Sequence, residues 1–209
     1  ADIELLDRSS YYFGISSGNT SGFLALEENQ YFVQEENWKI DDEDNYLKFF
    51  LGMRISSHLG FEFIIADLGK SSRAYKYTES VLIEDIHQLN YFVYEKTTSE
   101  STSYALNTIL SYPITNDILA FAKIGAHVWE IKQKFKFEES ISVPSLNYFE
   151  NYVDSFSETD ESINMYYAVG LDYRFSEFTV MFEFERYNFT TDDDDTHVNV
   201  LSLGIAYNF

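Results

Sequence analysis

Few residue types in this 209-residue chain could do covalent chemistry. The chain has no cysteine, which excludes thiolate nucleophiles, disulfides and thiolate zinc sites. The candidate general bases are four histidines: His58, His87, His127 and His197. Neither a Gly-x-Ser-x-Gly nor a His-Glu-x-x-His pattern occurs, so no motif ties a histidine to a nucleophile or a metal. We therefore expect that the protein is not an enzyme.

Carboxylates are the other abundant reactive group. The chain has 35 acidic residues against 14 lysines and arginines, a net charge of −21, which argues against nucleic-acid binding. Clustered carboxylates suit a hard cation such as calcium, although the spacing here is not that of a calcium-binding loop. The alternative is a solvated acidic face. We expect no cofactor; if a divalent cation binds, its candidate ligands are Asp41, Asp42, Glu43, Asp44, Asp192, Asp193, Asp194 and Asp195.

Strict alternation of apolar with small or polar residues indicates which elements carry these groups. Residues 163–175 and 201–209 alternate at every position, as side chains do on the two faces of a strand. No apolar run approaches the length of a membrane-spanning helix. The pattern predicts about eight strands, at 9–17, 46–56, 59–69, 102–112, 117–132, 162–175, 178–190 and 197–209.

The connections between these strands alternate in length. Those at 56–58, 113–116 and 176–177 are tight, whereas long loops are expected at 18–45, 70–101 and 133–161, with a short acidic loop at 191–196. Short turns at one end and long loops at the other are typical of an outer-membrane barrel. The predicted fold class is therefore all-β, an eight-stranded antiparallel transmembrane β-barrel. Partial alternation at 89–94 leaves open that strands extend beyond the membrane as a hairpin.

The two faces of the strands predict which side meets lipid. A narrow barrel accommodates small and charged groups inside, which leaves the Leu, Phe and Tyr face for hydrocarbon. The alternative is a soluble barrel with the faces reversed. Because lone charges in a narrow lumen are costly, we expect Glu62 to pair with Arg54 or Lys123, and Glu183 with Lys123. Parity places eight charged residues in the lumen, where they would form a plug unless some lie in water near the rims: Glu62, Asp172, Glu183, Glu185, Lys48, Arg54, Lys123 and Arg174.

Aromatic residues fall into two groups. One group lies near the short turns and predicts an interfacial girdle: Tyr112, Tyr173, Phe175, Phe178, Tyr207 and Phe209. The other lies in the long acidic loops, where aromatic side chains and strand edges suit recognition of a protein or glycan, or addition of a partner strand. The alternative is that these loop aromatics only pack the loops together or lie at the outer lipid interface.

Several segments resemble the transmembrane barrel of outer membrane protein A. They are SYPITND at 111–117, KIGAHVW at 123–129, AVGLDY at 168–173 and LSLGIAYNF at 201–209, with a weaker match of LGFEF at 59–63. The resemblance implies periplasmic termini, surface loops and a C-terminal aromatic assembly signal at Phe209. It implies a lumenal ion-pair cluster as well, in which Glu62 and Asp172 match the acids but Ile109 and Met181 occupy the basic positions.

The resemblance also sets what we expect of the whole protein. We expect a single monomeric barrel domain over 1–209, without the peptidoglycan-binding periplasmic domain of some relatives, integral to the bacterial outer membrane. Its expected partners are outer-membrane lipid, lipopolysaccharide, and a protein or glycan at the surface loops. The expected role is structural and surface-interacting, with membership of an envelope assembly left open. A narrow porin is the alternative, and a lipid-modifying enzyme a further one.

Overall fold

The computed structural model describes residues 10–22, 38–83, 87–190 and 195–209. Nine strands in these residues form one antiparallel sheet. No helix in the described part of the chain is long and apolar enough to cross a membrane. The strands are β1 (Ser10–Ser21), β2 (Trp38–Asp41), β3 (Glu43–Arg54), β4 (Leu59–Ile83), β5 (His87–Pro113), β6 (Ile118–Val143), β7 (Tyr148–Phe175), β8 (Phe178–Thr190) and β9 (Asp195–Asn208).

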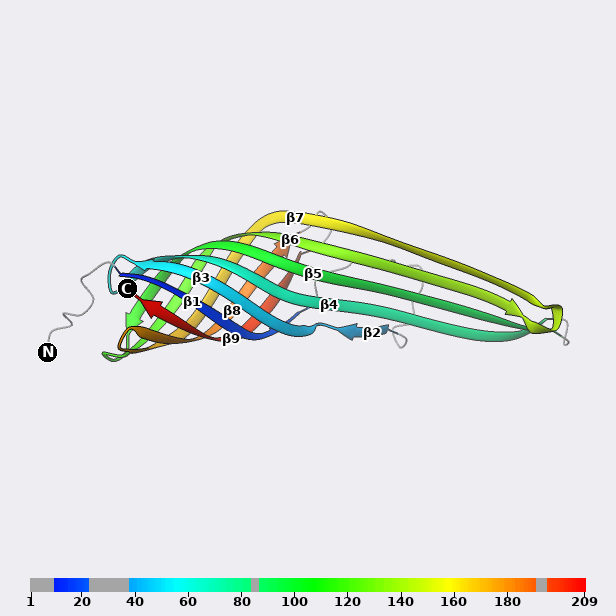
Figure 1. Ribbon diagram of the computed structural model, residues 1–209, viewed down its shortest axis with the longest axis horizontal. Helices are drawn as coiled ribbons and strands as arrows, with labels where there is room; N and C mark the ends of the chain where they lie inside the picture. The colour runs from blue at the N-terminus through cyan, green and yellow to red at the C-terminus, as the bar shows by residue number, and fades with distance from the viewer. Residues whose placement is uncertain (1–9, 23–37, 84–86, 191–194) are drawn as a thin grey trace.

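Eight of these strands close into a ring, which confirms the predicted barrel. Each pairs with the next along the chain, β2 aside, and β9 returns to β1 with Ile205 opposite Ile15. β2 stands outside the ring on the edge of β4, where Trp38 pairs with Tyr75. The start of β1 and the end of β9 lie at the end of the barrel that carries the tight turns (Figure 1).

The faces of the strands are arranged as the alternation predicts. Outward-facing Leu106 and Ile163 are 65% and 66% exposed, whereas the neighbouring inward-facing Ala105 and Asn107 are buried. Closure of the ring pairs the backbone groups of the strands, which is required in a hydrocarbon solvent. The expected girdle residues face outward at the tight-turn end, and three of them touch in sequence, with ring centroids 5.8 Å apart for Phe175–Phe178 and 5.6 Å apart for Phe178–Tyr207.

Small residues inside the barrel leave room for a few large ones. Tyr12 of β1 lies over Gly52 of the neighbouring strand β3, where an added Cβ would lie 2.0 Å from the tyrosine Cζ atom. The Tyr12 hydroxyl then donates to Glu62 at 2.9 Å. The lumen is therefore filled by packed side chains, as in other eight-stranded barrels.

The prediction of long loops at 70–101 and 133–161 was wrong. β4 and β5 stay paired from Leu59 opposite Leu110 to Ile83 opposite His87, and β6 and β7 stay paired to Val143 opposite Tyr148. Outside the bilayer a strand needs no apolar face, so the hydropathy alternation that marks the barrel fades. Tyr, Phe, Thr and Val nevertheless still favour strands there.

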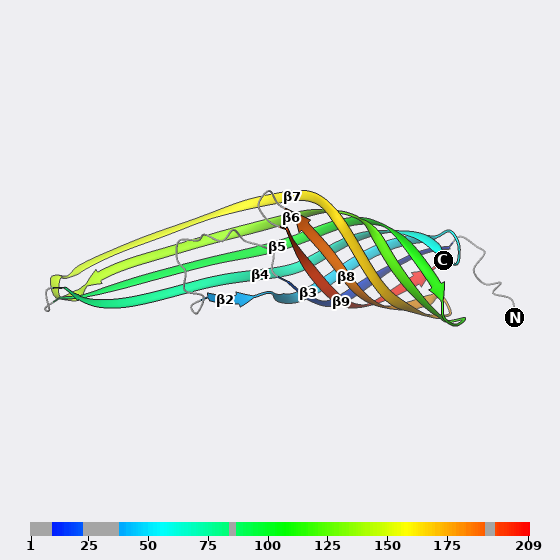
Figure 2. The same ribbon diagram turned by 180° about the vertical axis from the view of Figure 1, so that it is seen from behind.

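The four long strands continue past the barrel as one sheet, visible as the long extension in both views (Figures 1 and 2). We call residues 70–83, 87–101, 130–143 and 148–161, with β2, the projecting sheet. The predicted loop 18–45 is also shorter than expected, since β1 runs to Ser21 and β3 begins at Glu43; 23–37 lies outside the described residues. In the predicted loop 191–196, 191–194 is likewise outside them, and 195–196 begins β9.

A β-bulge marks where the barrel becomes the projecting sheet. The register of β4 with β5 shifts between Asp67 and Lys70, and Gly69 there has a φ of +78°. The Asp44 carboxylate accepts a hydrogen bond from the Lys70 backbone N–H at 2.8 Å, and the Asp67 carboxylate accepts one from the Gly69 N–H at 3.0 Å. Bulges bend and twist a strand, so this one redirects β4 as it leaves the ring.

Candidate functional site

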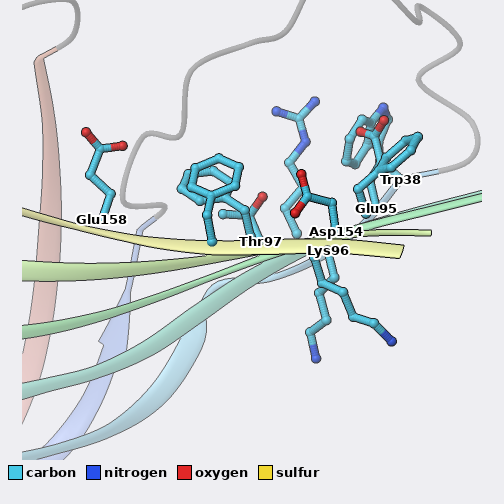
Figure 3. Close-up of a pocket in the computed structure, with 11 residues that line it drawn as sticks. Trp38, Glu95, Lys96, Thr97, Asp154 and Glu158 are labelled. Atoms are coloured by element: carbon cyan, nitrogen blue, oxygen red, sulfur yellow. The ribbon is translucent and has the colours of Figure 1, made fainter. Parts of the chain in front are cut away.

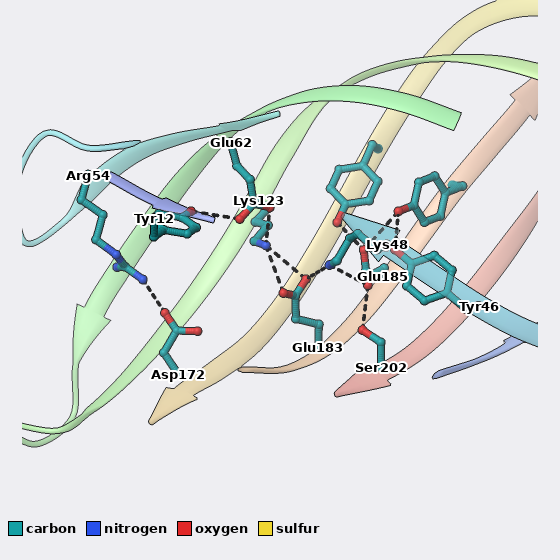
Figure 4. A network of polar contacts seen from close by, with 12 residues as sticks. Tyr12, Tyr46, Lys48, Arg54, Glu62, Lys123, Asp172, Glu183, Glu185 and Ser202 are labelled. Carbon is teal, nitrogen blue, oxygen red and sulfur yellow. Dashed lines mark hydrogen bonds and ion pairs between the residues drawn. The ribbon is translucent and has the colours of Figure 1, made fainter. Parts of the chain in front are cut away.

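The centre of the barrel holds a connected ion network (Figure 4). Glu183 of β8 accepts from Lys48 Nζ at 2.7 Å and from Lys123 Nζ at 3.1 Å. Lys123 also reaches Glu62 at 2.6 Å, and Lys48 reaches Glu185 at 3.0 Å. All five side chains are buried, and each comes from an inward-facing strand position. The network therefore links β3, β4, β6 and β8 across the lumen.

Hydroxyl groups complete the shell of Glu185. One carboxylate oxygen accepts from Tyr166 at 2.6 Å, Tyr46 at 3.0 Å and Tyr187 at 3.2 Å. The other oxygen accepts from Ser202 at 2.8 Å as well as from Lys48. A carboxylate with this many donors needs only one cation beside it.

The remaining predicted lumen charges lie nearer the tight-turn end. Arg54 donates to Asp172 at 2.5 Å and to the Ser111 hydroxyl at 3.4 Å. Arg174 is partly buried on the same side but makes no ion pair within 4 Å with any described residue. The structure thus joins seven of the eight predicted residues into pairs and leaves Arg174 outside them.

Sequence reasoning missed the tyrosines of the network. Tyr12, Tyr46, Tyr166 and Tyr187 all occupy inward positions by parity, and that signal could have found them. Only charged residues were predicted for the lumen, although a tyrosine hydroxyl is a suitable donor for a carboxylate that has too few cations beside it. That the network blocks conduction stays a prediction.

His127 has a serine partner inside the barrel. Its Nδ1 lies 2.9 Å from the Ser103 hydroxyl and its Nε2 lies 2.7 Å from the Asn188 carbonyl oxygen. Because a carbonyl can only accept, Nε2 carries the proton and Ser103 donates to Nδ1. Both residues are fully buried, and the rings of Tyr187 and Phe189 pack against the imidazole at centroid distances of 5.4 Å. This pair is suited to holding strands together.

The candidate calcium ligands do not converge in the described residues. No group of three or more histidine or acidic side chains there is arranged to hold a metal. Asp44 is engaged by the backbone of Asn45 and Lys70, and Asp195 begins β9. Asp192, Asp193 and Asp194 lie outside the described residues. The expectation of no cofactor, with a divalent cation as the alternative, stays a prediction.

The second candidate site is a groove of about 250 Å³ on the projecting sheet (Figure 3). Two of its phenylalanines, Phe135 and Phe156, stack with centroids 4.5 Å apart. The Arg73 guanidinium covers the Trp38 ring at 3.9 Å. In the close-up, Glu95 and Asp154 point to the same side of the sheet as Trp38, whereas Lys96 points to the other side. This face, which continues the lumenal side of the strands, we call the groove face.

Charge in the groove is mainly negative. Glu95, Asp154 and Glu158 line it against Arg73 on the groove face, whereas the side chains of the lining residues Lys96 and Lys136 point to the other face. Partial burial raises the pKa of Glu95 above its usual range, and the nearby Arg73 only partly offsets this rise. Exposed rings beside carboxylates can hold cationic and apolar groups together.

Comparison with protein families decides what kind of molecule carries these features. A family model described as the OmpA-like transmembrane domain matches residues 7–209. The chain belongs to this family. The OmpA-like resemblance and the predicted location are confirmed: this is an integral protein of the bacterial outer membrane. No curated protein matches the chain in sequence.

Solved structures similar to this OmpA-like chain include three outer-membrane proteins of low sequence identity. Ail of Yersinia pestis, solved with the heparin analogue sucrose octasulfate, is 14% identical with a TM-score of 0.43, covering 96% of this chain and 97% of that one. The N-terminal β-barrel of Pseudomonas aeruginosa OprF is 11% identical, with a TM-score of 0.44 and coverages of 97% and 100%. Neisserial surface protein A is 10% identical, with a TM-score of 0.46 and coverages of 97% and 99%.

Proposed function

We propose that this OmpA-like barrel is a non-enzymatic, non-conducting scaffold that presents the projecting sheet to a partner at the cell surface. The partner binds the groove face and supplies basic side chains together with apolar surface. The observation that carries the proposal is the ordered groove, where stacked Phe135 and Phe156 stand beside carboxylates instead of being covered. Phe156 is 59% exposed, far more than packing within the sheet would require.

The chemistry of the groove supports a basic protein segment as the partner. On the groove face three carboxylates stand against one guanidinium, because the lining residues Lys96 and Lys136 point their side chains to the other face. A ligand with lysine or arginine therefore gains charge complementarity. The rings of Phe135 and Phe156 offer apolar surface to the stems of those side chains. A glycan would use the same rings by stacking, and the binding experiment separates the two.

A binding experiment on the folded protein tests this proposal. The full chain in neutral-lipid nanodiscs is titrated with a basic peptide library and with a panel of neutral oligosaccharides. Peptide binding is expected, with about a tenfold or greater loss for Phe156→Ala or Asp154→Asn. The matched control Val153→Ala changes the opposite face of the same strand and keeps binding. Equal binding by Phe156→Ala, or binding of oligosaccharides alone, would contradict the proposal.

The closed lumen is tested separately from partner binding. The paired charges at Lys123 and Lys48, packed between aromatic rings, support a barrel that passes no steady current. In a planar bilayer we expect no reproducible conductance steps from the wild-type chain. Steady, large steps that change with Glu62→Gln or Lys123→Met would instead identify a narrow porin.

A further inference from the structure

The lysines of the chain are distributed very unevenly. Of nine, two lie in the lumenal network, and the others all fall on one face of the projecting sheet. Antiparallel register places side chains of directly paired residues on the same face. Lys39, Lys96 and Lys136 share one cross-strand row through Ala74, and Lys70 shares another with Glu100 and Lys132. We call this the lysine face; its lysines are Lys39, Lys70, Lys76, Lys96, Lys132, Lys134 and Lys136.

The lysine face is the reverse of the groove face. Lys96 points away from Trp38, Glu95 and Asp154 in the close-up (Figure 3). It also continues the lipid-facing side of the barrel, because the strands β5 and β6 keep one register from Pro113 opposite Leu119 to Asn90 opposite Ser142. A ligand of this face can therefore be a component of the membrane itself.

Positive charge dominates the rows between Lys70 and Lys76. Within them the seven lysines share the face with three acids, Asp41, Glu100 and Glu138. Glu100 pairs with Lys70 at 3.1 Å and with Lys134 at 3.4 Å, and Glu138 with Lys136 at 3.6 Å. These ion pairs leave the lysines accessible to solvent, since the Lys70 and Lys134 side chains are 62% and 63% exposed.

Three lysines of the face have no acidic partner among the described residues. Lys39, Lys76 and Lys96 make no ion pair within 4 Å there, in a protein whose net charge is −21. Excess positive charge concentrated on one sheet face, while the rest of the chain is acidic, marks a surface for anions.

The height of the lysine face distinguishes between kinds of membrane lipid. The last apolar outward row contains Tyr104 and Val128, and the first lysine row, with Lys132, lies four residues further along the strands. This is about 13 Å along a strand and about 10 Å in height at the usual strand tilt of a membrane barrel. A phospholipid headgroup layer is only about 5–8 Å thick. The row between carries Asp67, Glu130 and Glu161, which disfavours phosphate at headgroup level.

We propose that the lysine face binds the phosphate groups on the sugars of an outer-leaflet glycolipid, lipopolysaccharide. Its sugars extend beyond the phospholipid headgroup level and bear phosphates, which lysine binds as a point charge. The acidic row beneath excludes phospholipid phosphates and sets the height of the site. Binding on this face leaves the groove face free, so the two faces act independently and can fail independently in experiment.

Titration of the full chain in neutral detergent with purified lipopolysaccharide, followed by native mass spectrometry, tests the proposal. Wild type is expected to retain the glycolipid, and the triple variant Lys96→Gln, Lys134→Gln, Lys136→Gln to lose about tenfold to a hundredfold in affinity. The charge-preserving variant with arginine at the same three positions keeps wild-type binding. The control Arg186→Gln removes a positive charge from β8 and leaves binding unchanged.

Binding of further ligands distinguishes the phosphates of lipopolysaccharide from phospholipid phosphates and from the sulfates of a polysaccharide. Dephosphorylated lipopolysaccharide and phosphatidylglycerol are expected to bind at least tenfold more weakly than intact lipopolysaccharide. Equal binding of the dephosphorylated glycolipid, or an unaltered affinity in the glutamine variant, would overturn the proposal. Retention of a heparin fragment but not of lipopolysaccharide would also overturn it and identify a sulfated-polysaccharide site instead.

Discussion

At the scale of single residues, Glu183 determines how the lumen is held together. Its carboxylate is shared by Lys48 and Lys123, and each lysine carries a second carboxylate on its far side. Taking charges out of water is costly, so an arrangement of this kind is stable only when each member keeps its partners. The sequence predicted these charged residues and the pairing of Lys123 with Glu183, and it offered Lys123 as one partner of Glu62. The bridge through Lys48 to Glu185 depends on side-chain reach across the lumen, which one strand alone does not reveal.

Removing the Lys123 charge should therefore lower the free energy of unfolding far more than removing the charge of an exposed lysine. Lys123→Met leaves Glu62 without a cation, and we expect a loss of about 3–5 kcal/mol in the free energy of unfolding. Adding Glu62→Gln should recover much of it, because Glu183 keeps Lys48. Urea titration in lipid vesicles measures this. The control Lys132→Met breaks an exposed ion pair with Glu130 and should lower the free energy of unfolding by less than about 1 kcal/mol. Equal losses of stability in Lys123→Met and Lys132→Met would be inconsistent with the network.

The pKa values of two glutamates of the projecting sheet should be shifted in opposite directions from the usual glutamate value. Burial raises the pKa of Glu95, so its ionisation opposes folding of the sheet, and its penalty appears as pH rises from the ordinary glutamate range. Hydrogen bonds from Lys70 and Lys134 lower the pKa of Glu100, so its stabilising contribution is lost only when pH falls through that lowered value. Carbon-13 carboxyl titration should place Glu95 above Glu100; the reverse order would refute the assigned surroundings.

At the scale of elements, the strands inside the membrane were predictable and their extensions were not. Hydrocarbon forces an apolar outer face, so residues 163–175 and 201–209 reveal their strands by alternation alone. Beyond the membrane, lysine and glutamate occupy the outer face of β6 from Lys132 to Glu138, and Phe135 and Phe137 lie on the opposite face. The apolar outer face that marks a membrane strand therefore ends, although the backbone pairing continues. The groove could not be predicted because it brings together strands that the sequence placed in separate loops.

The bulge at Gly69 should control the base of the projecting sheet. Gly69→Ala places a side chain at a positive φ and only 2.8 Å from Asp44 Cβ, so β4 must shift where it leaves the ring. We expect faster proteolysis within 70–101 while the barrel stays intact. Limited proteolysis in nanodiscs measures this, with Ser72→Ala as the control. Unchanged protection in Gly69→Ala would show that the bulge does not fix the sheet.

At the scale of the whole molecule, charge is sorted by location. Acids and bases neutralise one another in the lumen, acids and aromatic rings share the groove face, and lysines occupy the reverse face. A net charge of −21 conceals this sorting, because composition carries no information about which face a residue occupies. A rigid sheet with two chemically different sides can hold membrane glycolipid on one side and a protein on the other.

The orientation of the chain is the claim on which the account depends most, and impermeant labelling of intact cells tests it most directly. The chain has no cysteine, so single cysteines can be introduced at Phe156 on the projecting sheet and at Ser176 in a tight turn. With a maleimide too large to pass porins, we predict that Phe156→Cys reacts in intact cells and Ser176→Cys only after the outer membrane is breached. Labelling of Ser176→Cys, but not of Phe156→Cys, in intact cells would contradict the account.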